Sequence, residues 1–133
     1  MFNTTQNHYR LSFCEFIPHS SNVTEVIIDE GIEVNEAMVD EYHAWLDAHH
    51  KDDFAVLINK KNHYTYTFNA QLRLGKIEKM KVAAFLVKDK AAETAVKSLM
   101  GIKQRRQMPN HIFYDRAEAL SWLEQQFIKN GKY

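Results

Sequence analysis

Two short apolar runs joined by a helix-length connection constrain the fold of this chain more than any other feature. The runs are residues 54–58 and 82–87, and neither leaves a polar face for solvent. Strands that are buried on both faces are typical of parallel sheets, in which neighbouring strands are joined by a long crossover. The sequence therefore predicts a βαβ unit and, with it, an α/β fold.

Patterns on either side of this unit extend it to a mixed five-stranded sheet with about four helices. Strands are expected at residues 8–17, 23–29, 54–58, 82–87 and 111–114, and helices at 36–49, at about 67–74, between Asp89 and Gly101, and after Asp115. The turn residues 20–22 predict an N-terminal antiparallel hairpin, whose first strand should end at Pro18. The remaining strands are expected to be parallel and wound right-handed.

The composition is that of one globular domain, which we expect to span residues 1–133 with terminal tails at about 1–7 and 129–133. Acidic and basic residues number 17 each, so no overall charge attracts nucleic acid or an anionic membrane. One cysteine, Cys14, excludes an internal disulfide. The chain shows neither a signal-peptide pattern nor an apolar run of the roughly 20 residues that a membrane span needs. A cytoplasmic protein is therefore predicted.

The order of the expected elements resembles that of the STAS domain family, the fold of bacterial anti-sigma-factor antagonists, and that of the related CRAL-TRIO-like lipid-binding group. The likeness covers about residues 9–127. Small STAS-like proteins of marine bacteria are similar to this chain in the stretches FAVLINKK and YTYTFNAQ, at 54–61 and 64–71, and in IFYD followed by ALSWL, at 112–115 and 119–123. The resemblance implies a STAS-like fold and a regulatory rather than a catalytic protein.

One part of the family pattern is missing. Classical antagonists carry a phosphorylated serine in a turn between the third strand and the second helix, whereas residues 59–65 contain neither serine nor glycine here. The nearest hydroxyl groups, on Thr65 and Thr67, lie outside the family motif. No phosphorylation site is therefore carried over from the family to this chain.

Polar residues follow the buried strands, at the edge where ligands and partners of open α/β sheets bind. The candidate ligand- or partner-binding residues are Asn59, Lys60, Lys61, Asn62, His63, Tyr64 and Lys88. Asp89, Asp115 and residues 29–30 are expected at the same edge. The simpler alternative is that these loops are polar because they are solvated, and that Asp89 and Asp115 act only as helix caps.

Other constellations carry weaker hypotheses. His43, Asp47 and His50 share a helical stripe but lack a firm metal-ligand pattern, so a solvated helix end is the preferred interpretation and no metal is predicted. The basic residues of the 103–107 segment lack a nucleic-acid motif. Cys14 lies in a strand, where burial is the usual outcome. The aromatic residues Tyr64, Tyr66 and Phe68 form either the lip of a pocket or part of the core. Scattered glycines argue against a nucleotide-binding loop, and no cofactor is predicted.

Together these patterns favour a non-enzymatic regulatory or scaffolding module. It would dock an unidentified protein partner through residues 59–64 and the second helix, with Lys60 and Lys61 supplying charge and Tyr64 supplying contact area. The alternative is a carrier of a small amphiphile or lipid between sheet and helices, although bulky residues there favour a filled interior. An enzyme that pairs His63 with Asp89 or Asp29 ranks third. Homodimerisation through the exposed edge strand is a further expectation.

Overall fold

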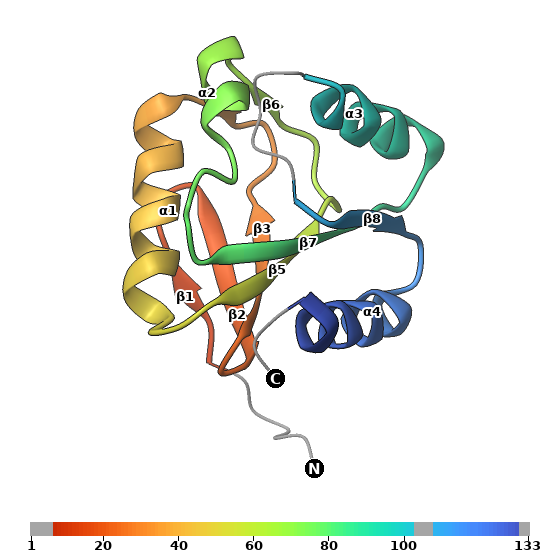
Figure 1. The fold of residues 1–133 in the computed structure, drawn as a ribbon. Coiled ribbons are helices and arrows are strands. Elements are labelled where there is room, and N and C mark those ends of the chain that lie inside the picture. Colours follow the sequence, from red (N-terminus) through yellow and green to blue (C-terminus); the bar gives the residue numbers. More distant parts are fainter. Residues whose placement is uncertain (1–6, 103–107, 131–133) are drawn as a thin grey trace.

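A computed structural model describes residues 7–102 and 108–130, within which eight strands form two sheets and four helices lie between or after the later strands (Figure 1). The strands are β1 Tyr9–Arg10, β2 Cys14–Ser20, β3 Val23–Ile28, β4 Glu33–Val34, β5 Phe54–Asn59, β6 Thr65–Tyr66, β7 Met80–Leu86 and β8 Asn110–Phe113. The helices are α1 Glu36–His49, α2 Phe68–Arg73, α3 Lys90–Met100 and α4 Arg116–Asn130.

The main sheet has six strands in the order β1-β2-β3-β5-β7-β8. The first two pairs of neighbours are antiparallel, and the pairs β3–β5, β5–β7 and β7–β8 are parallel. In the central parallel pair, Val56 lies opposite Ala83 and Leu57 opposite Ala84. The predicted mixed α/β sheet with an N-terminal antiparallel hairpin is confirmed.

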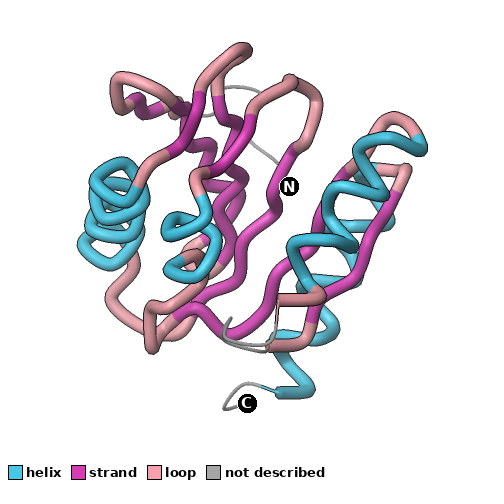
Figure 2. Tube along the Cα trace, turned by 90° about the horizontal axis from the view of Figure 1, so that it is seen from above, coloured by secondary structure: helices cyan, strands magenta, loops and turns pink. Residues whose placement is uncertain are grey.

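Helices cover both faces of this sheet, and alternate residues of the central strands β5 and β7 divide between two apolar clusters. The larger cluster joins Val56 and Phe85 of the sheet to the inner faces of α1 and α3. The smaller one joins Leu57 and Ala84 to α4 through Leu123 and its neighbours. Figure 2 shows the strands side by side with helices around them. The strand ends are therefore held rigidly from both faces.

Side-chain caps explain where three of the helices begin. The side chains of Asn35, Thr67 and Asp89 accept hydrogen bonds from the backbone N–H groups of Met38, Ala70 and Ala92, respectively. Each cap satisfies one of the donors that a helix leaves free in its first turn. Residues at helical spacing then face the core, as Val39, Tyr42 and Leu46 do in α1. These starts agree with the sequence prediction.

The predicted strand at residues 8–17 is two strands, so the main sheet has six strands rather than five. The chain reverses between them in a tight turn, in which the Leu11 N–H donates to the Cys14 carbonyl at 3.0 Å. The reversal places Tyr9 opposite Phe16. The apolar–polar alternation continues through the turn, so the sequence alone does not show that the strand is interrupted there.

Pro18 does not end its strand, contrary to the prediction. It pairs with Thr24 of β3, and the register shifts between Pro18 and Ser20. A proline without an N–H donor is tolerated at such an irregularity. The two-residue strands β4 and β6 pair in parallel, with Glu33 opposite Thr65, and were not predicted because two residues show no periodicity.

Candidate functional site

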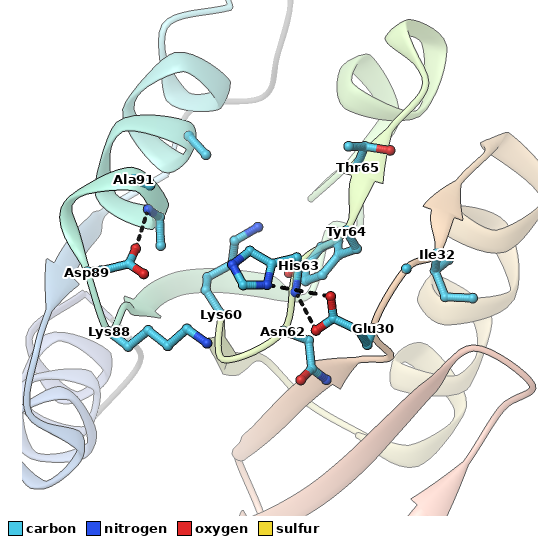
Figure 3. Close-up of a pocket in the computed structure, with 13 residues that line it drawn as sticks. Glu30, Ile32, Lys60, Asn62, His63, Tyr64, Thr65, Lys88, Asp89 and Ala91 are labelled. Atoms are coloured by element: carbon cyan, nitrogen blue, oxygen red, sulfur yellow. Dashed lines mark hydrogen bonds and ion pairs between the residues drawn. The ribbon is translucent and has the colours of Figure 1, made fainter.

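The segment from Asn59 to Tyr64, called here the 59–64 loop, contributes four residues to the lining of a pocket of about 450 Å³. The pocket lies between the start of α3 on one side and the β3–β4 connection on the other (Figure 3). Its lining residues are Glu30, Gly31, Ile32, Lys60, Asn62, His63, Tyr64, Thr65, Lys88, Asp89, Ala91, Ala92 and Ala95. A volume of this size lies in the range of small-molecule sites, which hold about 300–1,000 Å³.

Hydrogen bonds fix the 59–64 loop to the β3–β4 connection. The Asn62 side-chain amide donates to the Ile28 carbonyl at 2.9 Å, and the Gly31 N–H donates to the His63 carbonyl at 2.7 Å. Gly31 has φ +79°, a conformation that glycine adopts without strain. On the opposite side, the Lys60 N–H donates to the Leu86 carbonyl at 2.8 Å, which extends the β5–β7 pairing by one residue. The loop is thus preorganised although it has no regular structure of its own.

Lys60 is the unusual residue of the site, because its side chain turns inward and only 9% of the residue is exposed. Its Nζ lies over the Tyr64 ring, 4.1 Å from the centroid, and 5.4 Å from the centroid of the Tyr66 ring. Within residues 7–102 and 108–130, no carboxylate forms an ion pair with it. Burial lowers the pKa of Lys60 from 10.5 to about 8. The aromatic faces stabilise the ammonium only in part, since a cation–π contact supplies about 0.5–2 kcal/mol.

Tyr64 forms the base of the site beneath Lys60. Its hydroxyl is buried and has no hydrogen-bond partner among the described residues. Burial and the neighbouring Tyr66 raise the pKa of Tyr64 well above 10, so the group stays a neutral phenol. The two rings meet edge to face with centroids 5.6 Å apart, and both pack against the larger core cluster. The core-packing interpretation of these two aromatics agrees with this arrangement.

The carboxylates around the pocket are already held by other donors. The Glu30 carboxylate accepts from the His63 N–H at 3.1 Å and lies 3.5 Å from Nδ1 of the His63 ring. The Asp89 carboxylate caps α3 by accepting from Ala92 at 2.9 Å. The second cation, Lys88, is exposed and donates from Nζ to the Lys61 carbonyl at 2.7 Å. Among the residues that the structure describes, the buried ammonium of Lys60 therefore has no counter-ion.

The structure brings five of the seven predicted site residues together around one pocket: Lys60, Asn62, His63, Tyr64 and Lys88. Asn59 points to the other face of the sheet, where its amide donates to Glu25 at 2.8 Å. Lys61 is exposed outside the pocket. A binding role for these seven residues stays a prediction. The apolar wall of Ile32 and the α3 alanines was missed, because alanines on a helix carry no polar signal in sequence.

A buried polar cluster on the opposite face was also missed. Glu25 of β3 is fully buried, and it pairs with Arg116 at the start of α4 and with His19 at 2.8 Å. Burial alone would raise the pKa of Glu25, but hydrogen bonds from His19 and Asn59 and the charge of Arg116 outweigh it and lower the pKa. A charged residue inside the apolar run 23–28 is the signal that identifies such a cluster.

The residues of the other constellations have separate structural roles. His43 is partly buried and accepts from the Gly75 N–H at 3.2 Å, whereas Asp47 pairs with Lys79 at 3.3 Å. His50 is buried, donates to the Ser21 carbonyl at 3.0 Å and accepts from the Thr24 hydroxyl at 2.7 Å. The three side chains of the helical stripe therefore do not converge on one point.

Cys14 is buried in the core, and burial raises the pKa of its thiol to about 12. The pairing of His63 with Asp89 or Asp29 is not observed, since His63 contacts Glu30 and Asp29 pairs with Arg10. The basic segment 103–107, like the tail residues 1–6 and 131–133, lies outside the described residues.

This arrangement of sheet and helices defines a SpoIIAA-like α/β fold, as the resemblance to STAS domains predicts. A solved structure with such a fold, an uncharacterized protein of the DUF3478 family from Shewanella loihica PV-4, is similar over 90% of this chain and 92% of its own, with a TM-score of 0.52. The sequence identity is 14%, so the similarity shows the fold alone. No protein-family model and no curated protein matches the chain. Within the described residues, no helix has the length and apolar character needed to cross a bilayer.

Proposed function

We propose that this protein is a non-enzymatic module that docks another protein through the 59–64 loop and the start of α2. The observation that carries the proposal is the rigid attachment of an irregular loop to the β3–β4 connection. A surface that is already ordered before binding loses less conformational entropy when a partner arrives. STAS-like architecture agrees with this function at the level of the fold.

The side chains available to a partner are those that the domain itself leaves exposed. Lys61 and His63 are exposed on the loop, and Phe68 at the start of α2 is 66% exposed. An exposed large apolar side chain and exposed basic side chains are the kinds of group that anchor a partner segment carrying an acidic residue. Lys60 is buried and Tyr64 is partly buried with its hydroxyl inside the protein, and both line the pocket.

The docking proposal is tested by affinity capture with a Lys61→Glu/Phe68→Ser double variant. Lys51→Glu is the matched control, because Lys51 is also exposed but lies in the connection between α1 and β5. We expect the wild type and the control to retain a partner that the double variant loses, with a weakening of about tenfold or more in a direct binding assay. Equal retention by all three proteins contradicts the proposal.

The carrier of a small amphiphile is the second candidate. The cavity between the sheet and α1–α3 measures about 40 Å³ and is lined by Tyr42, Val56, Phe85 and other apolar residues. It holds a few water molecules at most, since one water occupies about 10–15 Å³ on this measure. The filled interior favours docking over lipid transport. Native mass spectrometry of the purified protein tests the carrier, because the absence of a bound mass of several hundred daltons argues against it.

The homodimer remains a prediction. The edge strand β1 has two residues, and Arg10 in it pairs with Asp29. So short and charged an edge offers little backbone for pairing with a second copy. Analytical ultracentrifugation decides between monomer and dimer, and the cytoplasmic location is tested by fractionating the source cells.

A further inference from the structure

The buried ammonium of Lys60, which forms no ion pair within the described residues, is the feature of the pocket that indicates a ligand. The residue is nine-tenths buried, and it lines a cavity that is open to solvent and of ligand size. A buried ammonium without a carboxylate is costly, because the attraction that normally offsets its desolvation is missing. An anion in the pocket would supply that attraction.

The start of α3 adds a second source of positive potential. Ala91 and Ala92 in its first turn line the same pocket as Lys60. The first N–H groups of a helix have no partner inside the helix and favour a negative charge near them. The Asp89 carboxylate takes one of these donors, the Ala92 N–H. The remaining potential of the helix end and the Lys60 ammonium act on the same space.

The other residues that line the pocket indicate the chemistry of the uncharged part of the ligand. Ile32, Ala92 and Ala95 present apolar surface to the pocket, and the volume of about 450 Å³ exceeds the room that a bare oxyanion needs. The occupant would therefore combine an anionic head with a compact apolar body. Glu30, which borders the pocket with its carboxylate held by His63, would disfavour a second negative charge on that side.

We propose that this pocket binds the carboxylate or phosphate group of a small organic anion, with Lys60 as counter-ion and the α3 terminus as a second donor. The inference rests on the proposed function in taking the 59–64 loop as a recognition surface. The anion belongs either to a free small molecule or to a side chain of the docked partner. Both sources place the same chemical group against Lys60.

The test uses the isolated protein, without any partner, in an NMR titration of backbone amides at constant ionic strength. Benzoate and phenyl phosphate are the anionic probes, and benzamide is the neutral match for benzoate. We expect saturable shifts at Ala91, Ala92 and the 59–64 loop with the two anions, and binding of benzamide weaker by about tenfold or more. Absence of saturable shifts with either anion, or equal binding of benzamide, overturns the proposal.

Amino-acid substitutions then test whether the anions bind in this pocket. Lys60→Met should weaken anion binding by about tenfold or more, whereas Lys61→Met on the exposed neighbour should leave it unchanged. Ala91→Glu places a carboxylate in the first turn of α3, where it is compatible with the helix, and should also weaken binding relative to Ala91→Gln. Unchanged affinity in both Lys60→Met and Ala91→Glu overturns the proposal.

Two further probes distinguish the sources of the anion. N-acetylaspartate amide and N-acetyl-O-phosphoserine amide represent acidic side chains of a partner. Lys60-dependent binding of these amides at least as tight as that of benzoate supports the partner as the source, and much weaker binding supports a free small molecule. The capture experiment with Lys61 and Phe68 variants leaves the pocket intact, so docking and anion binding fail independently.

Discussion

At the scale of single residues, Lys60 holds a charge in a place where an apolar side chain would fit. Its stem is buried and its ammonium lies over the aromatic faces of Tyr64 and Tyr66. Replacing an uncompensated buried charge by an apolar group of similar length is commonly neutral or stabilising. A residue that lowers stability at such a site is typical of a functional position.

Lys60→Met should therefore raise the free energy of unfolding at pH 7 by about 1 kcal/mol, after the loss of the cation–π contact is counted. Urea denaturation followed by circular dichroism measures the change. Lys61→Met, on the exposed neighbour, should stay within about 0.5 kcal/mol of the wild type. A Lys60→Met protein less stable than this control would show that the lysine supports the fold.

His43 should make the protein sensitive to acid. Burial lowers the pKa of His43 from 6.5 to about 4, and the pKa of His50 is lowered in the same direction, again chiefly by burial. Between these values the unfolded chain binds a proton that the folded protein excludes, so stability falls as the pH drops from about 6.5 to about 4.

The expected loss from His43 is at most about 3 kcal/mol. His43→Gln keeps an acceptor for the Gly75 N–H but does not titrate, and it should flatten the dependence of the unfolding free energy on pH. Parallel pH profiles for His43→Gln and the wild type would refute this account of acid sensitivity.

The buried carboxylate of Glu25 is stabilised by Arg116, which lies far from it in the sequence. Arg116→Met removes one donor from a carboxylate that stays buried, and we expect it to lower the free energy of unfolding by about 2 kcal/mol. Arg73→Met is the matched control, since the Arg73–Asp40 pair is exposed and solvent-screened and should contribute much less. Chemical denaturation compares the two, and equal losses would argue against a special role for the buried pair.

At the scale of elements, the sequence predicts helices better than short strands. Caps such as Asn35 and Asp89 mark helix starts through local chemistry that a single sequence contains. The β4–β6 pair and the turn at Leu11–Cys14 depend on contacts between distant or very short segments, which leave no periodic pattern. The burial of Lys60 was missed for a similar reason, because lysine is exposed in most proteins and only the packing of Tyr64 and Tyr66 makes this one an exception.

The start of α3 has a stability role that can be separated from its role in the pocket. Asp89→Ala removes the cap and should lower the free energy of unfolding by about 1 kcal/mol, whereas Asp89→Asn keeps the cap and should change it little. Thermal denaturation measures both.

Because Asp89→Asn also removes a negative charge beside the pocket, it should tighten the binding of benzoate in the titration. Weaker binding by Asp89→Asn would contradict the placement of the anion near the α3 terminus.

At the scale of the whole molecule, α4 covers one apolar face of the parallel sheet, and among the described elements no other helix contributes to that cluster. Leu123 and Phe127 are buried there against strands β5 and β7. Two side chains of this kind contribute about 3–6 kcal/mol by burial, which is comparable with the net stability of a small domain.

Truncation after Tyr114 should therefore abolish cooperative unfolding and cause aggregation. Light scattering and thermal melts followed by circular dichroism detect both effects. Removal of residues 131–133 is the control and should leave the melt unchanged. A truncated protein that remains monomeric and melts cooperatively would show that the sheet does not need this helix.

The position of α4 after all the strands that it covers has a consequence for synthesis on the ribosome. Those β-strands emerge first, and their apolar face stays exposed until α4 has left the exit tunnel. The nascent chain is thus open to wrong association during the interval in which the strands have emerged and α4 has not. The Glu25–Arg116 pair forms only at the close of that interval, because it joins β3 to the start of α4.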